Sequence, residues 1–72
     1  MKILDLHGEY HRSVQGIVEE FVFSNETPLK IITGKSQRMR ELVTQVTNRS
    51  GLYCHFENLT NSGCLIITKY KI

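Results

Sequence analysis

The sequence has 72 residues, of which 40% are hydrophobic and 22% are charged, a composition that predicts one globular domain over residues 1–72 with a single small core. The formal charge of +2 is mildly basic, which permits a polyanionic partner and does not require one. No long apolar run follows Lys2, so we expect no signal peptide, no membrane span and a cytoplasmic location.

The chain is predicted to begin with a short strand at residues 3–8 that carries polar side chains to its C-terminal end. Successive side chains of a strand point to opposite faces, so Leu4 and Leu6 share one face. Asp5 and His7 share the other face. The glycine that follows them allows a sharp turn because it has no Cβ atom. An acid and an imidazole beside such a turn form a candidate site.

An amphipathic helix is predicted next, ending before Pro28 because the residue before a proline is biased away from helix. Its apolar side chains recur with the spacing of one helix stripe: Val14, Ile17, Val18, Phe21 and Val22. Glu19 and Glu20 fall off that stripe, towards water. Gly16 lies inside the helix, where a glycine costs up to about 1 kcal/mol relative to alanine.

A buried strand, a turn and a second helix are predicted after the proline. Residues 29–33 are apolar and rich in β-branched side chains, which favour a strand, and residues 34–36 form the turn. The second helix spans residues 37–48, and its apolar stripe consists of Met39, Leu42, Val43 and Val46.

The chain is predicted to end in a hairpin with strands at residues 52–57 and 64–70, joined by a loop of asparagine and glycine turn residues. If Glu57 lies near Cys64, then Cys54 and Cys64 sit about three positions apart along the ladder. At ~3.3 Å per residue this is roughly 10 Å, which is too far for a disulfide. We therefore expect two free thiols, as in a reducing compartment.

The order β-α-β-α-β-β predicts an α+β fold, a two-layer sandwich with a four-stranded mixed sheet. Strands that alternate with helices indicate that the first two strands run parallel, linked by right-handed crossovers. If these strands are neighbours, their carboxyl ends meet and residues 5–8 and 33–36 line one crevice. Open α/β sheets usually bind ligands in crevices at the carboxyl ends of their strands.

Three cations crowd the start of the second helix. Residues 34–36 read GKS, the tail of a nucleotide-binding loop, but that motif requires a glycine at the position of Leu29. What remains is a glycine turn at a helix N-terminus, where free N–H groups attract anions. Lys35, Arg38 and Arg40 stand at the wrong end of the helix dipole, and a phosphate among them would reverse that penalty. A solvated basic helix face is the alternative.

The sequence LDLHG at residues 4–8, followed by a helix and by ITGKS at residues 32–36, resembles the Smr (small MutS-related) domain family. The family's two motifs have the forms LDxH and [TH]GxG, and residues 61–63 resemble its Asn/Gly turn before the last strand. The resemblance implies a fold similar to the C-terminal domain of bacterial translation initiation factor three. It also implies nucleic-acid binding and, in several members, endonuclease activity that nicks structured DNA or cleaves RNA. Ser36 stands where the second motif has its last glycine.

The resemblance matches Asp5 and His7 to the first motif and residues 33–35 to the second. For cleavage of a phosphodiester we expect Asp5, His7 and Lys35 to be the catalytic residues. His7 would be the general acid or base, Asp5 would orient it or its surroundings, and Lys35 would stabilise charge on the phosphate. The residues expected to bind the nucleic-acid phosphates are Thr33, Gly34, Lys35, Ser36, Arg38 and Arg40. The alternatives without a catalytic role are that Asp5 caps the following helix or turn and that His7 is a polar residue at a strand end.

Several alternatives stay open at this point. The spacing of histidines and cysteines predicts no metal site, although Mg²⁺ held by Asp5 and substrate phosphates is retained as a cofactor to test. A nucleic-acid-binding module without catalysis and a protein-binding adaptor are the alternative functions. The sequence does not choose between DNA and RNA as the partner, nor does it predict an oligomeric state.

Overall fold

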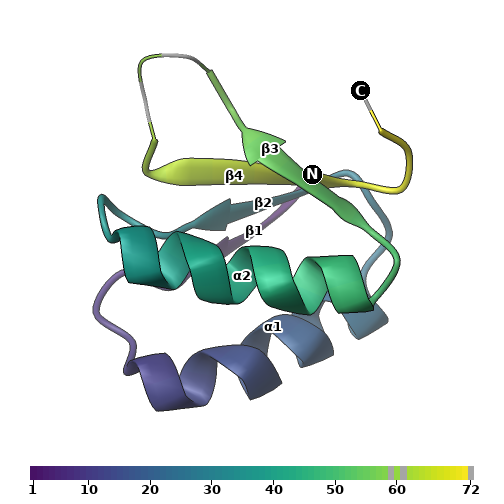
Figure 1. Ribbon diagram of the computed structural model, residues 1–72. Coiled ribbons are helices and arrows are strands. Elements are labelled where there is room, and N and C mark those ends of the chain that lie inside the picture. The colour runs from purple at the N-terminus through teal and green to yellow at the C-terminus, as the bar shows by residue number, and fades with distance from the viewer. Residues whose placement is uncertain (59, 61, 72) are drawn as a thin grey trace.

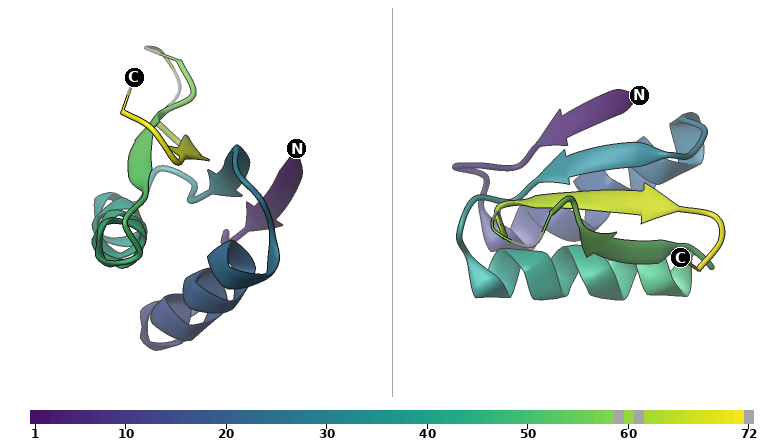
Figure 2. Two further views of the ribbon diagram at one scale, coloured as in Figure 1. Left: turned by 90° about the vertical axis from the view of Figure 1, so that its right-hand side faces the viewer. Right: turned by 90° about the horizontal axis from the view of Figure 1, so that it is seen from above.

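The computed structural model describes residues 1–58, 60 and 62–71, which form a sheet of four strands with two helices packed on one face (Figures 1 and 2). The elements in chain order are β1 (Lys2–Asp5), α1 (His11–Ser24), β2 (Leu29–Ile32), α2 (Gln37–Arg49), β3 (Tyr53–Phe56) and β4 (Cys64–Thr68). The strand order in the sheet is β1-β2-β4-β3. β1 pairs parallel with β2, while β4 is antiparallel to both β2 and β3. The predicted α+β fold with a mixed sheet is confirmed.

The core lies between the two helices and one face of the sheet. Ten hydrophobic side chains are buried there: Leu6, Val14, Val18, Leu29, Ile31, Met39, Val43, Val46, Leu65 and Ile67. Both predicted helix stripes face this core, since Ile17, Phe21, Val22 and Leu42 pack against its edge. The core is small, as expected for a domain of this length, so each buried side chain is a sizeable share of the total stability.

The opposite face of the sheet carries no helix, as the right-hand view of Figure 2 shows. Ile3 is 58% exposed on β1, next to Lys30 on β2 in the parallel register. Lys30 Nζ lies 2.9 Å from Glu57 Oε2. The hydrogen bond to the Glu57 carboxylate raises the pKa of Lys30, because it stabilises the charged ammonium.

The strands are shorter than the sequence pattern predicts. β1 ends at Asp5, so His7 lies in the turn beyond the strand and not on its face. The chain still follows the sheet for one residue, because the Leu6 N–H donates to the Ile32 carbonyl (2.8 Å). The predicted strand ends at residues 33, 52, 57 and 69–70 lie outside the strands, and α2 runs one residue further than expected, to Arg49.

The hairpin register and the state of the cysteines agree with the sequence. The Glu57 N–H donates to the Cys64 carbonyl (3.1 Å), and Cys54 pairs with Ile67. Neither cysteine forms a disulfide with another described residue. Burial raises the pKa of Cys54, because desolvation disfavours the thiolate. Of the turn expected at residues 61–63, Asn61 lies outside the described residues.

Gly16 lies in the interior of α1, and a Cβ atom added to it would meet no atom within 4 Å. We expect Gly16→Ala to stabilise the domain by about 1 kcal/mol, because alanine loses less backbone entropy in a helix. For a domain of this size, that is a rise in Tm of roughly 4–8 °C. Thermal unfolding followed by circular dichroism measures the change, and a lower Tm would mean that the backbone at Gly16 needs its freedom.

Candidate functional site

Two segments lie together at the carboxyl edge of the sheet, and we call them the tip. Residues 5–8 comprise the last residue of β1 and the turn after it, and residues 33–36 follow β2. Parallel pairing places Asp5 opposite Ile32, so both strands end at the same level. The turns after them lie at the end of the molecule where both helices begin (Figure 1). The predicted crevice therefore joins both motif segments at one place.

The first turn is held by the Asp5 carboxylate. Its Oδ1 accepts the backbone N–H of His7 at 2.9 Å, and the Glu9 N–H donates to the Leu6 carbonyl at 2.9 Å. Gly8 has a φ of +88°, as the predicted sharp turn requires. Asp5 thus caps a turn and fixes the backbone that carries the imidazole. This is the structural role that the sequence analysis gave as the alternative to catalysis.

The second turn is anchored to the loop before β4. The backbone N–H groups of Thr33 and Gly34 both donate to the Gly63 carbonyl, at 2.8 and 3.2 Å. The Thr33 side chain is buried, and its hydroxyl donates to the Gly34 carbonyl at 2.9 Å. Thr33 and the Gly34 N–H therefore shape the turn from inside, and the groups left to meet a ligand come after them in the chain.

The two turns touch through His7 and Gly34. A Cβ atom on Gly34 would lie 3.3 Å from Cδ2 of the His7 ring, a tight contact. Gly34 has a φ of +68°, in the left-handed region that side chains with a Cβ rarely adopt. Glycine at this position both permits the turn and makes room for the imidazole.

Ser36 caps the second helix. Its backbone is extended (φ −81°, ψ 114°), and its Oγ accepts the N–H of Met39 at 3.1 Å. An N-cap residue needs a short polar side chain and no left-handed backbone. A serine therefore fits at this position, where the [TH]GxG motif has a glycine.

The three cations near the tip have different surroundings. Lys35 is exposed and, within the part of the chain that the structure describes, makes no ion pair. Arg38 Nη1 lies 3.6 Å from Glu41 Oε2, an exposed pair that solvent screens. The Arg40 guanidinium lies over the Phe56 ring, 5.9 Å from its centroid, and its buried Nη1 has no hydrogen-bond partner among the described residues. Lys35 is thus the cation best placed to meet an anion at the tip.

Two further groups near the tip were missed by the sequence reasoning. Arg12 stands in the first turn of α1, with its guanidinium 5.0 Å from the centroid of the Tyr10 ring. The criterion that singled out Lys35, a cation at the start of a helix, applies also to Arg12, although Glu9 lies three residues before it. Phe56 on β3 is 50% exposed and lies beside Arg40. Apart from the alternation of side chains along its strand, nothing in the sequence marked Phe56 as a functional residue.

The described residues contain no cluster of side chains suited to a metal ion and no helix suited to a membrane span. Among residues 1–58, 60 and 62–71, no three histidine, cysteine or carboxylate side chains gather closely enough to hold a metal ion. At the tip, the Asp5 carboxylate is the group that could contact Mg²⁺, so the protein side of such a site depends on phosphates brought by a substrate. Neither helix of the described chain has the length and apolar character that a bilayer crossing needs.

Comparison of the chain with models of protein families, with curated proteins and with solved structures found no match.

Proposed function

We propose that this chain is a Smr-type domain that binds the phosphodiester backbone of a nucleic acid at the tip and cleaves it with the help of His7. The observation that carries this proposal is the closeness of His7 to Gly34: a Cβ atom added to the glycine would lie 3.3 Å from Cδ2 of the imidazole. It makes one site of an imidazole and a cationic turn that are 27 positions apart in the sequence. An isolated imidazole or an isolated lysine would not suggest this chemistry.

Phosphate binding is supported by the start of α2. Its first turn contains no acidic residue, and the first N–H groups of a helix lack intrahelical partners. Ser36 satisfies the N–H of Met39, and the helix N–H groups before it have no intrahelical partner. A backbone phosphate placed there receives these donors and the positive end of the helix dipole. It also lies next in the chain to Lys35, which makes no ion pair with any described residue.

Cleavage is supported by the exposed imidazole of His7. In RNA, the neutral imidazole would accept the proton of the 2′-hydroxyl while the 2′-oxygen attacks phosphorus. The bond to the 5′-oxygen breaks, the leaving oxygen takes a proton from solvent, and a 2′,3′-cyclic phosphate remains. Lys35 would stabilise the charge that develops on the phosphate oxygens. Asp5 acts on this step through the turn, because its carboxylate accepts the His7 backbone N–H.

A module that binds without cleaving is the second candidate, and the same Asp5 hydrogen bond favours it. The Oδ1 atom of Asp5 accepts the backbone N–H of His7 and so holds the turn, and the Ser36 side chain caps α2. Binding therefore depends on fewer assumptions than cleavage does.

Binding is tested by titrating labelled RNA hairpins and branched DNA with the wild-type protein and with Lys35→Ala at several salt concentrations. We expect the variant to bind roughly three- to tenfold more weakly, and the slope of log K against log salt to become shallower by about 1. Lys69→Ala is the matched control. Because β4 runs antiparallel to β2, Lys69 follows the end of β4 that lies opposite to the tip. Absence of salt-dependent binding to either polymer, or equal losses in both variants, would refute the proposal.

Cleavage is tested on the same substrates with and without chelator. We expect His7→Ala to abolish product formation while retaining the affinity, and the neighbouring His11→Ala to retain both. Binding without product in the wild type assigns the non-catalytic function. Product that persists in His7→Ala excludes the imidazole from the reaction.

A further inference from the structure

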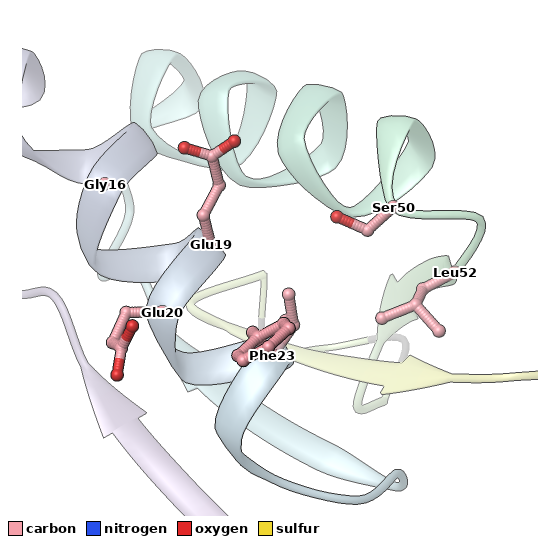
Figure 3. A pocket seen from close by; sticks show the side chains of 7 residues that line it. Gly16, Glu19, Glu20, Phe23, Ser50 and Leu52 are labelled. Carbon is pink, nitrogen blue, oxygen red and sulfur yellow. The ribbon is translucent and has the colours of Figure 1, made fainter.

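A groove of about 640 Å³ lies between α1 and the segment that follows α2 (Figure 3). Its walls include Gly16, Glu19, Glu20 and Phe23 from α1, with Ser50 and Leu52 from the other side. The 13 residues of α2 separate it from the tip, which corresponds to roughly 20 Å of helix. The groove is therefore distinct from the proposed nucleic-acid site.

The α1 wall of the groove is a second helix stripe beside the core stripe. Gly16, Glu19, Glu20 and Phe23 occupy positions i, i+3, i+4 and i+7, which fall on one side of a helix. The Phe23 side chain is 89% exposed, although a phenyl ring is among the most favourable side chains to bury. In Figure 3, Phe23 projects from the last turns of α1, and Ser50 and Leu52 lie on the opposite side of the groove. The stripe thus presents an aromatic ring that the domain itself does not cover.

The charge of this stripe is uncompensated within the described residues. Neither Glu19 nor Glu20 makes an ion pair, and Glu20 Oε1 accepts only the hydroxyl of Ser24, at 3.0 Å. The last turn of α1 contains no basic residue to balance the negative end of its dipole. Arg49, the basic residue in the last turn of α2, is not among the groove's walls. A cation supplied from outside would relieve this electrostatic penalty.

Gly16 adds an independent observation. It weakens α1 by up to about 1 kcal/mol relative to alanine, yet a Cβ atom at this position would meet nothing within 4 Å. No packing contact inside the domain explains the glycine. A partner whose backbone approaches α1 closely would need the room that the absence of a side chain at Gly16 provides.

We propose that this groove binds a cationic amphipathic helix of another protein. Its apolar side chains pack on Phe23 and Leu52, its lysines or arginines pair with Glu19 and Glu20, and its backbone passes over Gly16. An amphipathic helix in a groove with apolar anchors is a recurrent mode of peptide recognition. The two glutamates repel nucleic acid, so this interaction is additional to the function proposed for the tip.

The test uses a fluorescent peptide of about 18 residues, composed of leucine and lysine with helical spacing, and a leucine–glutamate peptide of the same pattern. We expect the cationic peptide to bind the full chain and the acidic peptide not to bind. Phe23→Ala and the double variant Glu19→Gln/Glu20→Gln should each weaken binding about tenfold or more, as truncation of interface anchors typically does. The matched controls are Tyr70→Ala, another exposed aromatic residue, and Glu9→Gln/Glu26→Gln, which removes the same charge from outside the groove.

A second variant separates binding from folding. Gly16→Gln introduces a strong helix former, so the domain should unfold at a higher temperature while the peptide loses access to the groove. Equal binding to all variants, or binding of both peptides, would overturn the proposal. A dimer in sedimentation that Phe23→Ala dissociates would also overturn it, because the groove would then belong to a second copy of the chain.

Discussion

Replacing Gly34 with alanine is expected to destabilise the domain by about 1–2 kcal/mol, because residues with a Cβ atom pay roughly that cost in the left-handed region. Gly34 has a φ of +68°, and the new Cβ would lie 3.3 Å from the His7 ring. The ring must then shift by a few tenths of an ångström. The substitution therefore acts on stability and on the proposed catalytic group together. Urea denaturation measures the first effect, and the NMR signals of the His7 imidazole report the second.

Gly51→Ala is the matched control for this experiment. Gly51 follows α2 with a φ of +77°, so alanine meets a similar backbone penalty there, but its Cβ would meet no atom within 4 Å. We expect comparable losses of stability from the two variants and a perturbed His7 signal in Gly34→Ala alone. If both variants, or neither, moved the His7 signal, the two turns would not share one site.

Leu6→Ala is expected to have the largest effect on folding. Leu6 is fully buried at the junction of β1 and the tip, and removal of a buried leucine side chain costs about 2–5 kcal/mol. At ~0.05–0.15 kcal/mol per residue, a 72-residue domain has roughly 4–11 kcal/mol in total. The variant should therefore lose a large share of its free energy of unfolding. Urea titration followed by circular dichroism measures the shift of the midpoint.

Ile3→Ala provides the comparison on the same strand. Ile3 is 58% exposed on the uncovered face of the sheet, so its truncation should cost less than about 1 kcal/mol. Equal losses at the two positions would mean that the open face is buried in solution, for example by association of the protein with itself.

Much of the fold was predictable because local patterns and packing agree. The apolar stripes of residues 14–22 and 39–46 identify the sides of α1 and α2 that face the core. The β-α-β order identifies the parallel pair, because a right-handed crossover places the two strands side by side. The strand ends were less predictable: Thr33 continues the apolar run of β2, but its N–H donates to Gly63 across the sheet and the chain turns there.

The candidate site was predictable in its location and less so in its contacts. The sequence predicted that residues 5–8 and residues 33–36 lie side by side. An aspartate at position 5, however, is compatible with a carboxylate that orients an imidazole and with one that caps a turn. The hydrogen bond to the His7 N–H shows the turn-capping role. The sequence also grouped Lys35, Arg38 and Arg40 as one basic cluster, whereas the side chains separate into an exposed lysine, an ion pair and a guanidinium over a phenyl ring.

The sequence by itself determined the order of the elements, the core-facing side of each helix and the meeting of the two motif turns. These follow from periodicity and chain connectivity, which are properties of neighbouring residues. Only the tertiary structure decided that His7 packs against Gly34, that the Gly63 carbonyl holds the second turn, and that Phe23 and two glutamates line an open groove. Such contacts depend on distances between segments that are far apart in the chain, and no local pattern encodes these distances.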